Sequence, residues 1–207
     1  MSHLVFSFDG AHGTGKDTLI AQVKEWLESD SHEVLYFSER WAAEQFYIPP
    51  LETLDRENVF EWELWWLIGL KKREEYVAKK LERAYPGTIV LENRDFRSSL
   101  AYTEATVGRD YFYSFLQEEI ETILNTIKLR RVPITLTCSV ETAMQRIQER
   151  DRAESKQWHE DSLDFWIKVD KNFKAFKDPL IWTDQENALE IAKVIINNRL
   201  LNDLRPM

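Results

Sequence analysis

A glycine-rich segment close to the N-terminus holds residues whose types and spacing could bind a phosphate. Gly10, Gly15 and Lys16 fit the pattern G-x-x-x-x-G-K, and Gly13 adds a position where the backbone can turn tightly. In such a loop the backbone amides surround a phosphate and the lysine reaches its outer oxygens. The segment therefore predicts an ATP site. The residues expected to line it are Gly10, His12, Gly13, Thr14, Gly15, Lys16, Asp17 and Thr18.

The residue after the lysine departs from the usual loop. A serine or threonine there normally places its hydroxyl on Mg²⁺, but this chain has Asp17, with Thr18 one position later. A carboxylate beside phosphates would be repelled unless a magnesium ion lay between them, so we expect Asp17 to act through the metal, directly or through water. In the alternative, Asp17 turns away as a helix N-terminal residue and Thr18 serves the metal through water. The sequence leaves both arrangements open.

The elements expected around this loop would position it as the chemistry requires. An apolar run over Leu4–Phe8 predicts a buried strand before the loop, and residues 16–28 carry apolar side chains at helical spacing after it. The helix N-terminus would then point at the phosphate. Further strands are expected at 33–37, 88–91, 133–138 and 180–182, and further helices at 58–84, 110–129 and 186–201. This alternation predicts an α/β fold, with a parallel sheet covered by helices on both faces.

Composition narrows the class of protein. The 207 residues are 43% hydrophobic and 30% charged and contain no Ser/Gly-rich linker, which predicts one domain over 1–207. A polar, weakly periodic segment at 150–160 is either a flap between two helices or an ordinary solvated connection. The net charge of −9 argues against nucleic acid or an anionic membrane surface as partner. Because a basic leader and a long apolar run are both absent, the chain is expected in the cytoplasm.

Three segments together resemble the thymidylate kinases. Phe8–Lys16 is similar to their F-E-G-x-D-G-x-G-K loop, Asn93–Tyr102 to their D-R-Y-x-x-S-S-L-A-Y-Q segment, and Arg146–Arg152 to the arginine-rich lid of nucleoside monophosphate kinases. The resemblance implies a five-stranded parallel sheet of the P-loop nucleoside monophosphate kinase type, often in a homodimer. It also implies transfer of the γ-phosphoryl group of ATP, with Mg²⁺, to a small-molecule acceptor, a nucleoside monophosphate.

The resemblance gives roles to individual arginines. Arg94 would hold the acceptor phosphate, and Arg146, Arg150 and Arg152 would form the lid over the ATP phosphates. Phosphoryl transfer between two anions depends on positioning and on neutralising charge, which explains a need for several arginines and a metal. In the alternative, Arg150 and Arg152 are surface cations at a helix end, where the helix dipole favours them.

Glu39, Ser98 and Tyr102 complete the expected acceptor site. Ser98 and Tyr102 belong to the same family-like segment as Arg94. Glu39 follows the second expected strand and resembles a glutamate found in both thymidylate kinases and deoxynucleoside kinases. It could order metal-bound water or act as a base toward a sugar hydroxyl. Because a terminal phosphate needs no base and a hydroxyl does, the role of Glu39 depends on the acceptor.

Departures from the family pattern fall on the acceptor side. His12 stands where the family has an acid beside the acceptor sugar, and Asn93 stands where it has the aspartate of the D-R pair. On the long expected helix, Lys72 replaces a base-contacting arginine and Ile68 a stacking phenylalanine, while Thr103 replaces a later glutamine. Lys72 is assigned to acceptor binding, although the charged residues around it suit a solvated helix face equally well. The resemblance therefore does not fix the base specificity.

Competing functions remain compatible with these residues. The leading hypothesis is an ATP- and Mg²⁺-dependent kinase for a nucleoside monophosphate. A deoxynucleoside kinase comes second, because it would share Glu39 and the arginine lid. A third is a P-loop kinase for another small molecule. The last is a nucleotide-binding module without catalysis, which His12, Asn93 and Asp17 suggest.

Overall fold

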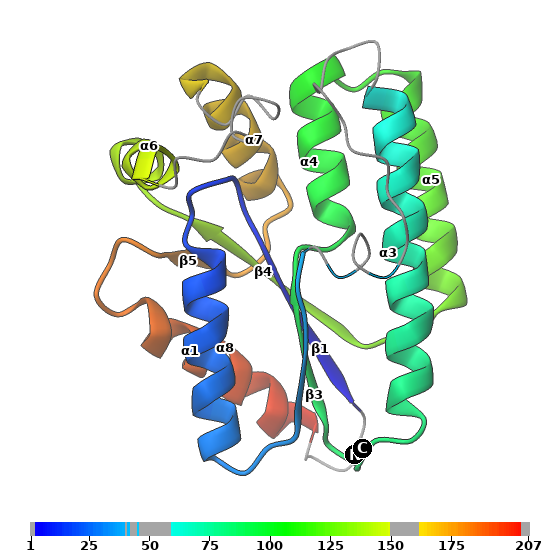
Figure 1. Ribbon diagram of the computed structural model, residues 1–207, viewed down its shortest axis with the longest axis vertical. Helices are drawn as coiled ribbons and strands as arrows, with labels where there is room; N and C mark the ends of the chain where they lie inside the picture. The colour runs from blue at the N-terminus through cyan, green and yellow to red at the C-terminus, as the bar shows by residue number, and fades with distance from the viewer. Residues whose placement is uncertain (1–2, 40, 42–44, 46–58, 150–161, 204–207) are drawn as a thin grey trace.

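A parallel β-sheet forms the centre of the molecule (Figure 1). The computed structural model describes residues 3–39, 41, 45, 59–149 and 162–203. Its sheet has five strands in the order β2-β3-β1-β4-β5, and each neighbouring pair is parallel. The strands are β1 (Leu4–Asp9), β2 (Val34–Phe37), β3 (Ile89–Asn93), β4 (Arg131–Thr137) and β5 (Leu180–Trp182). This arrangement confirms the predicted α/β fold.

The central strand β1 is buried on both faces, which explains its continuous apolar sequence. Leu4, Phe6 and Phe8 belong to the core shared with α1 (Lys16–Ser29) and α8 (Ala188–Asp203). Val5 packs on the opposite face against Val77 of α3 (Val59–Leu81). Alternate residues of one strand therefore anchor helices on both sides of the sheet, as a doubly covered sheet requires.

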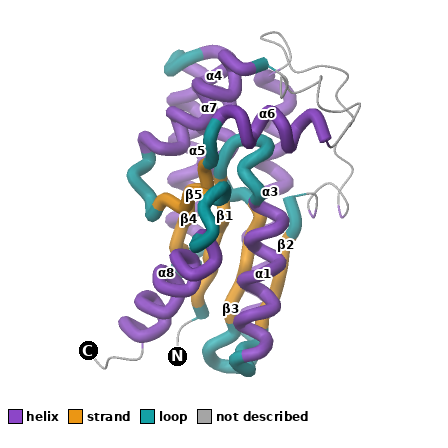
Figure 2. The backbone as a smooth tube through the Cα atoms, turned by 90° about the vertical axis from the view of Figure 1, so that its left-hand side faces the viewer, coloured by secondary structure: helices purple, strands orange, loops and turns teal. Residues whose placement is uncertain are grey.

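The remaining helices lie over the carboxyl ends of the strands and beside α3. They are α4 (Phe96–Val107), α5 (Tyr111–Thr126), α6 (Val140–Glu149) and α7 (Leu163–Ala175). Helices α4, α6 and α7 gather at the carboxyl end of the sheet (Figure 2), while α3, α4 and α5 share an apolar core. In open α/β sheets ligands bind at this end, so α4, α6 and α7 surround the expected site.

The structure corrects the predicted element list in two ways. The sequence prediction omitted α4, α6 and α7, and its long helices at 58–84 and 110–129 continue past the observed ends at Leu81 and Thr126. The expected flap at 150–160 lies outside the described residues, and so do Arg150 and Arg152. Within the ranges the structure describes, no helix combines the length and apolarity that a membrane span requires.

Candidate active site

The glycine-rich loop joins β1 to α1 at the carboxyl end of the sheet, and side chains from other elements hold its carbonyl groups. Each carbonyl from Gly10 to Thr14 accepts a side-chain hydrogen bond. The bonds run from Lys16 Nζ to Gly10 (2.9 Å) and Ala11 (3.0 Å), from Trp166 Nε1 to His12 (2.7 Å), from Arg146 Nη1 to Gly13 (3.2 Å) and from Thr183 Oγ1 to Thr14 (2.7 Å). With the carbonyls engaged, the loop amides are left to bind an anion.

Two glycines of the loop cannot be replaced without moving its neighbours. Gly13 has φ of +77°, and a Cβ there would lie 2.6 Å from the carbonyl oxygen of Ala143 on α6. Gly10 has φ of +151°, and a Cβ there would overlap the carbonyl oxygen of Leu136 on β4. The loop is therefore packed directly against β4 and α6, which fixes its position.

Lys16 lies inside the loop and is only 6% exposed. Burial, together with the nearby positive charge of Arg94, lowers the pKa of its ammonium group to about 7. Among the described residues, the ammonium donates hydrogen bonds to neutral acceptors, the two carbonyls of Gly10 and Ala11 and, at 3.5 Å, the hydroxyl of Thr14. A phosphate in the loop would give it a charged partner, which is a stronger interaction than a carbonyl provides.

Arg94 follows β3 and turns back toward the loop. Phe8 and Asn93 are in register on β1 and β3, so the residues that follow each strand begin side by side. Arg94 adopts φ of +66°, and its Nη1 donates to Gly10 O and to Ser98 Oγ, both at 3.2 Å. Its Nη2 lies 3.4 Å from Tyr102 Oη, and its Nε lies 2.9 Å from Glu39 Oε1. The structure thus brings together Arg94, Glu39, Ser98 and Tyr102, with His12 Nδ1 3.5 Å from Arg94.

Glu39 is the charged partner of Arg94, although 37% of its side chain is exposed. Burial by itself would raise the pKa of Glu39, but the positive charges of Arg94 and Lys16 outweigh it and lower the pKa to about 2. For Arg94, burial would lower the pKa, and Glu39 and Tyr102 raise it instead. Both groups are therefore ionised at neutral pH.

Asp17 and Asn93, which both depart from the family pattern, contact each other. Asn93 Nδ2 donates to Asp17 Oδ1 at 2.6 Å, across 76 positions of sequence. The other polar atom of the amide, Asn93 Oδ1, is buried, and no residue that the structure describes gives it a hydrogen bond. Asp17 and Thr18 are both exposed at the start of α1. A carboxylate and an amide oxygen are hard oxygen ligands, which suit Mg²⁺.

Arg73, which the sequence analysis did not assign, reaches the same end of β3 from α3. Its Nη2 donates to the carbonyl of Arg94 at 2.7 Å, and its Nη1 lies 3.5 Å from the carbonyl of Asn93. Lys72 beside it is exposed, and its assignment to the acceptor stays a prediction. The helical spacing of Leu70, Arg73 and Val77 marks a buried face and was the signal available.

Arg73 belongs to a buried cluster of opposite charges that also contains Glu74, Glu92 and Arg131. Arg73 Nη2 lies 3.4 Å from Glu92 Oε2, and Arg131 Nη1 lies 2.6 Å from the same oxygen. Arg131 also pairs with Glu74. Burial raises the pKa of Glu92 to about 7, with the charge of Arg73 acting in the opposite direction. This cluster lies behind the backbone of Arg94 and supports it.

A second buried pair, Asp9 and Asp95, fixes Ser98. Asp9 Oδ1 accepts from Ser98 Oγ at 2.6 Å and from the amide of Asp95 at 3.1 Å. Burial and the charge of Asp95 raise the pKa of Asp9 to about 8. Asp95 caps α4 by accepting from the amide of Arg97 at 2.7 Å. Ser98 is therefore held from one side by Asp9 and from the other by Arg94.

Arg146 is the one lid arginine within the described residues, and it faces the loop. Besides Gly13 O, its Nη1 contacts Thr183 Oγ1 at 3.1 Å and its Nη2 contacts Thr183 O at 3.3 Å. Thr183, which lies after β5, and Trp166 of α7 were not predicted, because nothing in their local sequence marks them. Both are brought to the loop by the fold alone.

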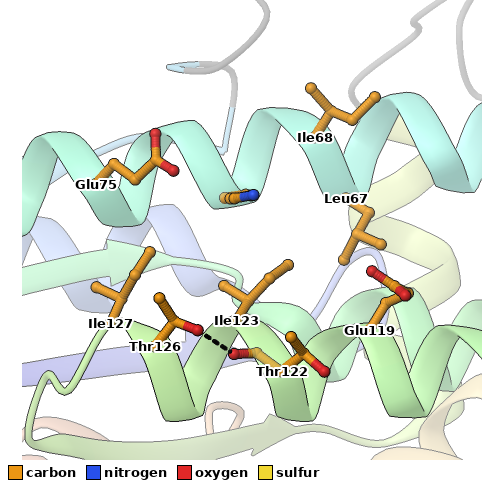
Figure 3. A pocket seen from close by; sticks show the side chains of 9 residues that line it. Leu67, Ile68, Glu75, Glu119, Thr122, Ile123, Thr126 and Ile127 are labelled. Atoms are coloured by element: carbon orange, nitrogen blue, oxygen red, sulfur yellow. Dashed lines mark hydrogen bonds between the residues drawn. The ribbon is translucent and has the colours of Figure 1, made fainter.

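Ile68 faces away from this site. It lines a groove between α3 and α5 (Figure 3), together with Leu67, Lys71, Glu75, Glu119, Thr122, Ile123, Thr126 and Ile127. None of the loop or Arg94-cluster residues lines this groove. Ile68 and Lys72, which stand where the family has a stacking phenylalanine and a base-contacting arginine, are both exposed on α3.

The chain was compared with models of known protein families. A family model described as thymidylate kinase matches residues 8–194. This range contains the glycine-rich loop, Arg94 and Arg146, so it covers the segments that carried the resemblance. A search of the curated proteins found no match.

Proposed function

The chain belongs to the thymidylate kinase family, and from this premise we propose how its residues divide the family's reaction, the ATP-dependent phosphorylation of dTMP. We assign the ATP phosphates to the loop from Gly10 to Thr18 and to Arg146. We assign the acceptor phosphate to Arg94. The observation that supports this proposal most directly is the 3.2 Å contact between Arg94 Nη1 and Gly10 O, because Arg94 then lies directly beside the loop that we assign to ATP.

The state of Glu39 supports a phosphate as acceptor. A general base works best when its pKa lies near the operating pH, and the pKa of Glu39 is about 2. Such a carboxylate is a weak base for a sugar hydroxyl, whereas an acceptor phosphate is already an anion. Glu39 would then orient Arg94. When the acceptor phosphate binds, it would either replace Glu39 as the partner of Arg94 or share Arg94 with it. Ser98 and Tyr102 complete the acceptor side by holding the other face of the guanidinium.

We propose that Asp17 and Asn93 hold Mg²⁺ between the loop and β3. When bound, the ion would neutralise charge on the phosphates. Asp17 supplies a carboxylate on α1, and Asn93 supplies an amide oxygen to which no described residue donates a hydrogen bond. Thr18 is the alternative ligand, through water. The Asp17→Asn variant tests the proposal by titration calorimetry: ATP binding should lose its dependence on Mg²⁺, and unchanged dependence would favour Thr18.

The lid arginines Arg150 and Arg152 lie outside the described residues and stay a prediction. Arg146 of α6 supports their assignment, since it lies only a few positions earlier in the chain and donates to Gly13 O. We propose that they approach the ATP phosphates from this side and stabilise charge in the transition state. Single substitutions to Met should lower kcat with little change in ATP affinity, whereas surface cations would leave kcat unchanged.

An acceptor panel tests the proposed function. ADP release with ATP and Mg²⁺ would be measured against dTMP, dUMP, the other deoxynucleoside monophosphates, thymidine and simple alcohols. We expect turnover with nucleoside monophosphates and not with thymidine. Turnover with thymidine alone would identify a deoxynucleoside kinase, and ATP binding without any acceptor-stimulated turnover would identify a binding module.

We also propose that the chain forms a homodimer through the groove between α3 and α5. Ile68 is 46% exposed there, and apolar residues of both helices line the groove (Figure 3). Burying this strip against a second copy would remove apolar area from water. Light scattering should report a dimer for the native chain and a monomer for Ile68→Glu. Val194→Glu, on α8 and 59% exposed, is the matched control and should stay dimeric.

A further inference from the structure

Glu63 of α3 is a buried acid with no charged partner among the residues that the structure describes. Its side chain is 3% exposed, and among the described residues its Oε2 has no hydrogen bond. It faces Ser99 and Thr103 of α4, whose hydroxyls are also buried and form no hydrogen bond of good geometry within the described chain. Buried polar groups in native proteins nearly always have partners, so three together call for an explanation. A ligand that supplies the partners is one.

These polar atoms lie next to the acceptor side of the site. On α4, Ser98 and Tyr102 contact Arg94, and Ser99 and Thr103 each follow one position later, about 100° around the helix. The next face of α4, with Leu100, packs against α3. Ser99 and Thr103 therefore lie where α3 and α4 adjoin, beside the face that contacts Arg94.

Helix α3 borders the Arg94 backbone from the same direction. Arg73, ten positions after Glu63 on this helix, donates to the carbonyl of Arg94. A nucleotide whose phosphate is held by Arg94 could extend its base toward the junction of α3 and α4. Ile68 and Lys72, which replace the family's base-contacting residues, are exposed on α3. Base recognition then requires other groups.

The protonation state of Glu63 defines what it could bind. Burial raises the pKa of Glu63 to about 8, and the hydroxyls of Ser99 and Thr103 oppose this only in part. Within the described part of the chain, no charged group contributes to this shift. A protonated carboxyl offers one O–H donor beside one carbonyl acceptor. Thymine and uracil present the complementary pair, the O4 acceptor beside the N3–H donor.

We propose that Glu63, as a neutral carboxylic acid, binds the O4 and N3–H edge of a thymine or uracil base in the acceptor nucleotide, with Ser99 and Thr103 beside it. This inference rests on the proposed function and names the groups that select its substrate. A carboxyl and an amide have the same donor and acceptor arrangement, so Gln should replace Glu63 while Leu should not. An ionised Glu63 could only accept hydrogen bonds, and its negative charge would repel the O4 oxygen of the base.

The first test compares Glu63→Leu, Glu63→Gln and the exposed control Glu61→Gln. We expect Glu63→Leu to raise KM for dTMP about tenfold or more at pH 7, because it leaves the base edge unpaired. Glu63→Gln and Glu61→Gln should stay near the native value, and KM for ATP should not change in any variant. An unchanged KM for dTMP in Glu63→Leu overturns the proposal. So does an equal loss in Glu63→Gln, which would indicate a structural role.

The second test uses pH and a modified acceptor and does not depend on the Leu variant folding. In the native chain, KM for dTMP should rise as pH passes about 8 and Glu63 ionises, and in Glu63→Gln this rise should be absent. Methylation of N3 in the acceptor should cost the native chain affinity and cost Glu63→Leu less. The same pH profile in Glu63→Gln, or an equal methylation penalty in both, overturns the proposal. Absence of turnover with every nucleotide in the native chain would instead refute the proposed function.

Discussion

The cluster around Arg94 and the junction of α3 with α4 each hold an acidic side chain, but only the first pairs it with a cation. Glu39 lies 2.9 Å from Arg94, and its pKa is lowered to about 2. Glu63 has no opposite charge beside it among the described residues, and burial raises its pKa to about 8. Burial acts in the same direction on both acids, so the presence of a cation decides the outcome. The first region is arranged for charge, and the second for neutral hydrogen bonding.

The largest expected effect comes from removing the cations of the paired region. Lys16→Met and Arg94→Met should each lower turnover about 10³-fold, because charge on the phosphates would lose its fixed partner. Initial rates of ADP release measure this. Arg109→Met is the control, since Arg109 is exposed and pairs only with Glu104 among the described acids. Near-native rates in Lys16→Met or Arg94→Met would contradict the proposed division of roles.

The next largest effect is expected from replacing Arg73. This change tests whether the cluster of Arg73, Glu74, Glu92 and Arg131 stabilises the fold by pairing opposite charges. Arg73→Met should lower the free energy of unfolding by about 3–5 kcal/mol, because it leaves Glu92 and Glu74 short of positive charge in the core. Urea denaturation measures this loss. Adding Glu92→Gln to Arg73→Met should restore part of the stability. A double variant less stable than Arg73→Met would show that pairing is not the cause.

A smaller, pH-dependent effect on stability is expected at Glu63, the acid without a charged partner among the described residues. The pKa of Glu63 is raised from 4.5 to about 8, so the folded chain keeps a proton that the unfolded chain loses above pH 4.5. Its contribution to stability is therefore complete below pH 4.5 and is lost as pH rises toward 8. Glu63→Gln should stabilise the chain by about 1–3 kcal/mol more at pH 8 than at pH 5. Asp9 titrates in both proteins, so equal pH slopes in urea denaturation would contradict the neutral state of Glu63.

The smallest effect is expected at Glu39, the acid that is paired with a cation. Glu39→Gln should change dTMP turnover by less than about tenfold, because a phosphate acceptor needs no general base. If Glu39 were a base for a hydroxyl, the same change would cost about 10²-fold or more. The rates with dTMP and thymidine, measured side by side, separate these outcomes.

Local patterns were the part of the site that the sequence could predict. The loop from Gly10 to Lys16 and strand β1 were recognised because strand, loop and helix follow one another directly in the chain. On α3 the sequence assigned Lys72 to the acceptor, which stays a prediction, and it missed Arg73, whose guanidinium reaches the end of β3. A shift of one residue turns a helix by about 100°, and an ungapped alignment contains no information that detects it.

Sequence alone determined the glycine-rich loop and the alternation of strands and helices, and it predicted Arg94 as the acceptor cation, because each depends on neighbours in the chain or on a family-like segment. The tertiary structure decided which distant groups meet. It placed Asn93 against Asp17 and Trp166 against His12, and it left Glu63 without a charged partner among the described residues. Pairing and protonation are set by distances between residues far apart in sequence, and those distances exist only once the chain has folded.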